Sequence, residues 1–197
     1  MGLLAGLDPA QILSGFGVGL LVGMTGVGGG SLMTPLLVLV FGFHPVTAVG
    51  TDLLFAALTK SAGMVVHGIN RTVDWTVTGL LALGSVPATL LTLAVLSQME
   101  KDAATARVIA TTLGWALLVT STMLIFRKAV LGFAARHGRA DLRPRSRATA
   151  TIATGAVLGL VVSISSVGAG ALGMTALLIL YPALPVTRLV GSDIAHA

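Results

Sequence analysis

Two clusters of small residues interrupt long apolar stretches, and they are the positions at which this sequence could bind a ligand. The first holds four glycines in five positions, Gly26, Gly28, Gly29 and Gly30. Glycine inside a helix costs about 1 kcal/mol relative to alanine, so this cluster predicts a break in the helix. The second lies at 167–170. A helix that starts after a break presents unpaired N–H groups and the positive end of its dipole, which attract an anion in a dry environment.

The candidate anion-binding residues are therefore small or hydroxyl-bearing residues at the two breaks. They are Thr25, Gly28, Gly29, Gly30, Ser31, Ser165, Ser166, Gly168 and Gly170. The alternative is that these small residues only allow helices to pack closely, which is the role we expect for Gly15, Gly19 and Gly23. A dinucleotide loop at 26–31 is not expected, because its sixth position is Ser31, no acidic residue follows it until Asp52, and no alternation of strands and helices surrounds it.

A second set of polar residues lies inside or beside the apolar stretches. The candidates for gating or proton coupling are Thr51, Asp52, Lys60, Ser192 and Asp193. An acid at membrane depth usually marks a pathway or a proton relay. The alternative is that both acids lie near the interface and cap helix starts. Lys60 either reaches the surface along its aliphatic stem or adds positive charge to an anion path, whereas His44 and His196 are expected at the rim.

The composition of the chain indicates that these polar residues lie in a membrane protein. The chain has 197 residues, of which 55% are hydrophobic and 10% charged, and it has no cysteine. Asp, Glu, Lys and Arg are absent from 9–51, 75–99, 108–126 and 148–187. Because about 20 apolar residues cross a bilayer, these stretches predict an all-α, polytopic bundle of transmembrane helices. Disulfide scaffolds, thiol chemistry and intrinsic disorder are excluded, and we expect no enzyme activity, no metal and no cofactor.

The expected apolar segments are 9–43, 46–68, 75–96, 108–126 and 149–181. The first is interrupted by its glycines into flanks of 16 and 13 residues, 9–24 and 31–43. Each flank is too short to span a bilayer alone. The flanks are therefore half-helices, either stacked end to end or folded into a re-entrant hairpin.

The two interrupted segments are copies of one another. A shift of 140 positions aligns 19–47 with 159–187, and 11 of 29 residues are identical. One inserted residue then brings Asp52 onto Asp193. This match predicts an internal repeat, each copy opening with a glycine-broken pair of half-helices. Paired breaks of this kind are the best sequence indication of a secondary transporter's binding site.

Most of the positive charge lies between the two copies. The segment 127–147 holds seven basic residues, Arg127, Lys128, Arg136, Arg139, Arg143, Arg145 and Arg147. A basic segment beside a membrane span indicates the cytoplasmic face rather than a nucleic-acid surface. We therefore divide the chain into a first transmembrane repeat at 1–126, a basic cytoplasmic loop at 127–147 and a second repeat at 148–197. The second repeat is expected to be incomplete, because counterparts of 46–126 are largely missing from it. A re-entrant first segment would make the repeats inverted and a spanning one would make them parallel, and the lack of early Lys or Arg favours the hairpin.

Two sets of motifs point to a known family. In the first copy they are residues 23–30, Pro35, His44, Pro45 and 50–52, and in the second copy they are 167–170 and 191–197. Together they resemble the sulfite exporter TauE/SafE family of membrane permeases, in the 4-toluene sulfonate uptake permease superfamily. The second copy departs from the first at Ser165, Ser166 and Ala169.

The resemblance implies a multi-pass permease of the inner cell membrane that moves sulfur-containing or organic anions such as sulfite or sulfonates. Its partners would be a small anionic substrate and the lipid bilayer, with no nucleic acid and with homo-oligomerisation left open. The alternatives are a passive anion channel and a membrane scaffold or fragment that does not transport.

Overall fold

The structure is a computed structural model that describes residues 9–25, 32–99, 103–126, 128–129, 132, 143–168 and 170–197, without the side chains of Gln11 and of 22–25. These residues form helices and no strand. The helices are α1 (Pro9–Thr25), α2 (Met33–Leu39), α3 (Pro45–Ile69), α4 (Trp75–Gln98), α5 (Ala103–Ile125), α7 (Pro144–Ser165), α8 (Ala171–Leu180) and α9 (Val186–His196). The predicted all-α architecture is confirmed for this part of the chain.

Among the described residues, four helices are long and apolar enough to cross a membrane, namely α3, α4, α5 and α7. They carry large apolar side chains on their outer faces, as at Leu90, Trp115 and Leu118, which are 63%, 64% and 60% exposed. In water these side chains would be unfavourable, and in a bilayer they meet lipid tails. The multi-pass membrane protein predicted from composition is therefore confirmed.

Local signals in the sequence determine where two of these helices begin. The carboxylate of Asp74 accepts the backbone N–H groups of Thr76 and Val77 at 3.1 and 3.2 Å, which caps the start of α4. Helix α7 starts at Pro144, inside the segment predicted as a loop and ahead of the expected start at residue 149. Proline favours the first helical turn because it has no N–H to leave unpaired and its φ already suits a helix.

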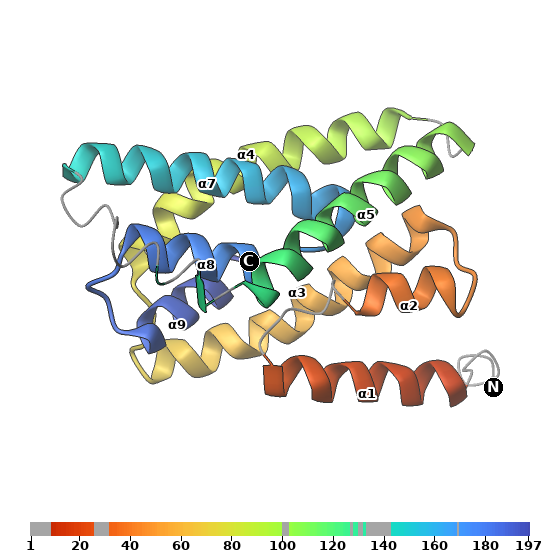
Figure 1. Cartoon of the computed structure of the whole chain (residues 1–197), viewed down its shortest axis with the longest axis horizontal. Coiled ribbons are helices and arrows are strands. Elements are labelled where there is room, and N and C mark those ends of the chain that lie inside the picture. The colour runs from red at the N-terminus through yellow and green to blue at the C-terminus, as the bar shows by residue number, and fades with distance from the viewer. Residues whose placement is uncertain are drawn as a thin grey trace.

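Two pairs of consecutive helices, α1 with α2 and α7 with α8, form antiparallel hairpins (Figure 1). Helices α1 and α2 run in opposite directions, as do α7 and α8, and the direction of α1, α2 and α3 is reversed in α7, α8 and α9 (Figure 1). The C-terminus, at the end of α9, lies near the middle of the view beside α8 (Figure 1). The second hairpin therefore brings α9 into the interior rather than to the rim.

Backbone contact between α4 and α7 forms the closest helix pair. A Cβ atom on Gly84 would collide with the carbonyl oxygen of Ile152, and one on Gly155 would collide with that of Leu81. Gly159 faces Ser85 in the same way. Small residues allow this approach, which adds van der Waals contact that lipid cannot supply.

Two of the glycines expected to pack closely leave room for a Cβ atom. A Cβ on Gly15 would lie 3.7 Å from Met33 Cε, and one on Gly19 would lie 4.0 Å from Phe55 Cζ. Both are ordinary van der Waals distances, so these two helix contacts do not require glycine. Gly23 lies outside the described side chains.

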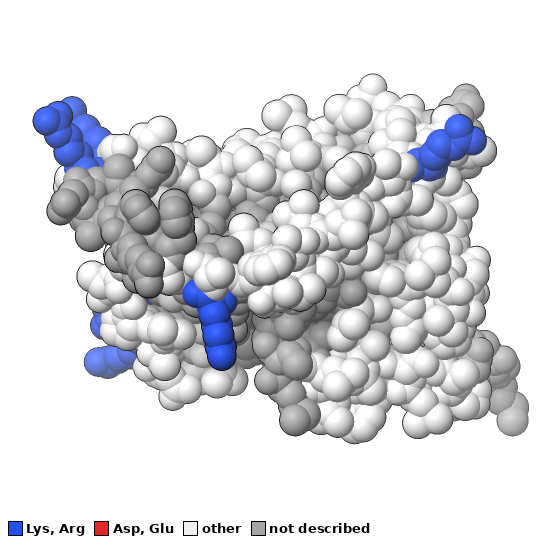
Figure 2. Space-filling view, in the orientation of Figure 1, with Lys and Arg blue, Asp and Glu red and all other residues white. Residues whose placement is uncertain are grey.

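The charged side chains are unevenly distributed over the molecule. Lys and Arg side chains lie mainly toward the left-hand side of the molecule, with one group at the upper right and a wide uncharged area between (Figure 2). The left-hand end holds the start of α7, with its basic residues Arg145 and Arg147 (Figure 1). By the positive-inside rule, this is the end expected to face the cytoplasm.

Candidate functional site

The first acidic residue of the predicted site is buried inside the bundle. Asp52 is the eighth residue of α3 and is fully buried. The hydroxyl of Thr34, on α2, donates a hydrogen bond of 2.6 Å to Asp52 Oδ2. The hydroxyl of Ser166 lies beside the same carboxylate, while Oδ1 has no hydrogen-bond partner among the described residues. Asp52 therefore joins the first hairpin to the end of α7.

The matching acid of the second copy is also buried. Asp193 is the eighth residue of α9 and is 6% exposed. Its Oδ1 has no hydrogen-bond partner among the described residues, and a Cβ on Gly173 of α8 would collide with it. Since Asp52 and Asp193 both lie two turns inside their helices, neither caps a helix start. The capping alternative is excluded by their positions.

Lys60 connects the two acids electrostatically. It lies near the middle of α3 and interacts with the charges of both Asp52 and Asp193. The imidazole of His196 is also within electrostatic reach of Lys60. We refer to Asp52, Lys60, Asp193 and His196 as the α3–α9 cluster.

Sequence reasoning did not identify His196 or Ser85 as part of this site. The Nε2 atom of His196 lies 2.8 Å from Ser85 Oγ on α4, and its Nδ1 is buried without a hydrogen-bond partner in the described part of the chain. His196 was expected at the rim, and this expectation was wrong because α9 enters the bundle interior. Its spacing of three residues from Asp193 was the signal that could have placed both side chains on one helix face.

The two predicted hydroxyl residues beside the acids have different surroundings. Ser192 is fully buried, and its Oγ accepts the backbone N–H of Asp74 at 2.8 Å and donates to the carbonyl of Arg188 at 2.8 Å. It therefore ties α9 to the start of α4. Thr51, next to Asp52 on α3, is exposed.

The second predicted break coincides with the turn between α7 and α8. Ser166 has a left-handed backbone with φ of 59°, and Gly168 has φ of 108°. Such a φ costs a non-glycine residue about 1–2 kcal/mol, and the repeat places Gly26 at the position that matches Ser166. The hydroxyl of Ser165 accepts the N–H of Val167 at 3.2 Å. Both serines are buried.

The donors available at the start of α8 are limited. The N–H groups of Leu172 and Gly173 already donate to the carbonyl of Gly168, at 3.0 and 3.3 Å. A ligand at this helix start would therefore use the N–H groups that precede Leu172, including that of Gly170, together with the nearby serine hydroxyls.

The first predicted break lies largely outside the described residues. This applies to Gly28, Gly29, Gly30 and Ser31, and Thr25 is described only as the last residue of α1. The placement of these five candidates relative to the α3–α9 cluster stays a prediction.

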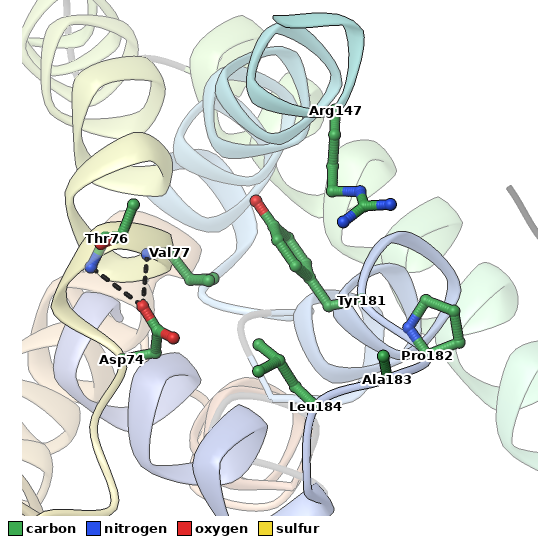
Figure 3. Close-up of a pocket in the computed structure, with 8 residues that line it drawn as sticks. All are labelled: Asp74, Thr76, Val77, Arg147, Tyr181, Pro182, Ala183 and Leu184. Carbon is green, nitrogen blue, oxygen red and sulfur yellow. Dashed lines mark hydrogen bonds between the residues drawn. The ribbon is translucent and has the colours of Figure 1, made fainter. Parts of the chain in front are cut away.

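A separate cavity of about 370 Å³ opens at the end expected to face the cytoplasm. It lies between the starts of α4 and α7 and the turn before α9 (Figure 3). Its lining residues are Asp74, Thr76, Val77, Arg147, Tyr181, Pro182, Ala183 and Leu184. The Tyr181 hydroxyl lies 2.9 Å from Thr151 Oγ1, and the guanidinium of Arg147 lies 5.7 Å from the tyrosine ring centre. Residues of the α3–α9 cluster do not line this cavity.

Comparison with known proteins identifies the family of this chain. The model of the sulfite exporter TauE/SafE family matches residues 11–197. The chain belongs to the sulfite exporter TauE/SafE family. It is therefore a multi-pass membrane protein of a transporter family, and the resemblance seen in its motifs is confirmed.

Two relatives from Bacillus subtilis (strain 168) agree with this family assignment. The chain is 37% identical to the probable membrane transporter protein YjnA over 193 residues, covering 94% of this chain and 73% of YjnA. It is 44% identical to the probable membrane transporter protein YunE over 72 residues, covering 36% of this chain and 25% of YunE. No solved structure matches the chain significantly.

The family assignment is consistent with transport rather than enzyme activity. Within the described residues, no group of three or more His, Cys, Asp or Glu side chains could hold a metal ion. The buried acids, the lysine and the hydroxyl groups can instead bind a charged solute and respond to protons.

The bond between Thr34 and Asp52 offers a direct test of this packing. Thr34→Val keeps the shape of the side chain but removes the hydroxyl that donates to Oδ2, so the buried carboxylate loses a partner. We expect the free energy of unfolding to fall by about 1–3 kcal/mol. Thermal unfolding in detergent would measure the change, with Thr34→Ser as the matched control. Equal melting temperatures for Thr34→Val and the wild type would contradict the assigned bond.

Proposed function

We propose that this chain is a secondary transporter for sulfur-containing or organic anions such as sulfite or sulfonates. The observation that carries the proposal is the position of Asp52. This acid comes from the first copy, and its carboxylate lies beside Ser166 at the turn of the second copy. A contact between the two copies in the bundle interior is what a binding site at a repeat interface requires.

The anion would bind between the two breaks, near the middle of the bilayer. At the second break, it would accept hydrogen bonds from the hydroxyls of Ser165 and Ser166 and from N–H groups near Gly168 and Gly170. At the first, the corresponding donors would be Thr25, Ser31 and the N–H groups of Gly28, Gly29 and Gly30. The opposite directions of the two hairpins in Figure 1 support an inverted repeat, which would allow the site to open alternately to each side.

Charged residues beside this site would control its opening. We assign gating or proton coupling to Asp52, Lys60 and Asp193, with Thr51 and Ser192 as the polar residues next to the acids. Lys60 supports this role because it interacts with both acids from the middle of α3. A positive charge there offsets the cost of bringing an anion into a region of low dielectric constant.

Counterflow in proteoliposomes would test the proposed transport. Vesicles loaded with unlabelled sulfite should accumulate labelled external sulfite, and excess sulfoacetate or an aromatic sulfonate should compete if it binds the same site. Net flux without counterflow would indicate a passive channel. Absence of any anion movement from folded protein would indicate a scaffold and contradict the proposal.

The second break can be tested in the same assay with Gly170→Leu. Gly170 has an ordinary helical backbone, with φ of −84° and ψ of −51°, so leucine is not strained there. A leucine side chain would add bulk beside the proposed N–H donors at the start of α8, and we expect counterflow to fall by about tenfold or more. The matched control is Gly114→Leu on α5, where a Cβ meets nothing within 4 Å. Equal flux in both variants would contradict the assignment of the break.

A further inference from the structure

We propose that Asp193 and His196 together form the site that binds and releases the proton that moves with the transported anion. This inference rests on the proposed anion transport and names the coupling ion for it. It also makes the two copies unequal, since the second copy alone would supply the proton site.

The geometry of α9 brings the two side chains to one face of a buried helix. Asp193 and His196 are three residues apart, which places them side by side on a helix surface. Asp193 is 6% exposed, and its Oδ1 has no hydrogen-bond partner among the described residues. The same is true of His196 Nδ1, whereas its Nε2 is held by Ser85 at 2.8 Å. One carboxylate oxygen and one imidazole nitrogen in the bundle interior are therefore left available for a proton.

The surroundings of the pair contain few other ionisable groups. Helix α3 contributes Asp52 and Lys60, with His67 farther along at the Gly191 contact. Helix α4 contributes Asp74 at its capped start, next to Ser192, and α9 itself carries Arg188. Helix α8 has no ionisable side chain, and its Gly173 leaves room for the Asp193 carboxylate.

Charge balance favours a proton as the coupling ion. The cluster holds two acids and one lysine, so an arriving anion adds a negative charge to a site that already has two carboxyl groups. Uptake of one proton by Asp193 or His196 offsets that charge while the anion is inside the bilayer. A metal cation would be repelled by Lys60, and no His, Cys, Asp or Glu group among the described residues is suited to one.

Asp52 and Asp193 differ in the residue of the neighbouring short helix that lies against each carboxylate. Asp52 Oδ2 accepts a hydrogen bond of 2.6 Å from the buried hydroxyl of Thr34. At Asp193, the neighbouring residue on the short helix is Gly173, which offers no side chain, and His196 lies one turn away. Of the two roles proposed above, we therefore assign gating to Asp52, through its bond to α2, and proton binding to Asp193.

The test follows protons and anions together. The full chain is reconstituted with a pH-sensitive dye inside the vesicles, and potassium with valinomycin holds the membrane potential at zero. The probe is labelled methanesulfonate, because a sulfonate stays ionised at every pH used and cannot carry a proton itself. We expect wild-type protein to acidify the lumen as the anion enters and to accumulate the anion when the outside is made more acidic.

Single substitutions identify the proton site. Asp193→Asn and His196→Gln should each lower the number of protons moved per anion, and accumulation driven by the pH gradient should fall by about tenfold or more. Ser85→Ala keeps both ionisable groups but releases the imidazole, so it should shift the pH dependence of accumulation. His44→Gln is the matched control, since this exposed histidine precedes α3 and should leave the proton-to-anion ratio unchanged.

The outcomes separate this inference from the proposed transport. Anion entry without luminal acidification in the wild type would overturn the proton site and leave the permease intact. An unchanged proton-to-anion ratio in both Asp193→Asn and His196→Gln would do the same. Absence of methanesulfonate, sulfite and sulfoacetate movement from the wild type would overturn both proposals.

Discussion

Gly84→Leu is expected to prevent stable folding of the helix bundle. A Cβ on Gly84 would collide with the carbonyl oxygen of Ile152, and the nearby backbone nitrogen of Ala156 would also be too close. Both atoms belong to the backbone of α7, so a change of rotamer cannot relieve the collision. Helices α4 and α7 would have to separate, at a cost of about 3 kcal/mol or more.

The matched control for this substitution lies on the same helix. A Cβ on Gly79 meets nothing within 4 Å, so Gly79→Leu adds an exposed apolar side chain to α4 without moving α7. Size-exclusion chromatography and thermal unfolding in detergent would compare the two variants. We expect Gly79→Leu to match the wild type and Gly84→Leu to aggregate or melt far earlier. Similar melting of both variants would show that α4 and α7 do not pack as described.

Lys60→Met is expected to abolish most anion transport. The substitution keeps an unbranched apolar side chain in α3 but removes the charge that interacts with Asp52 and Asp193. Loss of an opposite charge about 6 Å from a bound anion costs about 3 kcal/mol at an effective dielectric constant of 20, or roughly 100-fold in binding. Sulfite counterflow should fall by about this factor.

Two further variants distinguish loss of charge from loss of structure. Lys60→Arg keeps the charge and should retain much more counterflow than Lys60→Met. The double variant Asp52→Asn with Lys60→Met removes one buried acid with the lysine, and its melting temperature should exceed that of Lys60→Met, since fewer buried charges are left unpaired. Wild-type flux in Lys60→Met would contradict the role of Lys60 in the anion path.

The membrane helices were predictable because their signal is local. Absence of charged residues over 75–99 and 108–126 is enough to predict spans, since a bilayer excludes unpaired charge. The observed spans, Trp75–Gln98 and Ala103–Ile125, agree with these stretches within a few residues. The start of α7 at Pro144 was missed because the positive charges there resemble a loop, although they are tolerated at a helix end near lipid headgroups.

The candidate site was predictable only in part. The repeat drew attention to Asp52 and Asp193 as a matched pair, and both are buried eight residues into their helices. The sequence could not show that Thr34 bonds the first acid or that Ser85 bonds His196, because 18 and 111 residues separate the partners. Such contacts depend on which helix faces meet.

The sequence by itself determined that this protein folds in a membrane and that it is helical, and it predicted that its two unusual segments are a matched pair. Each of these follows from local composition or from self-similarity, since hydrophobic length selects a bilayer span and duplication repeats a motif. Only the tertiary structure decided that α9 enters the bundle, which gathers Asp193, His196, Lys60 and Asp52 into one cluster. The reason is that helices in lipid associate through close backbone approach at a few small residues, such as Gly84 and Gly155, and their choice of partner emerges from three-dimensional fit.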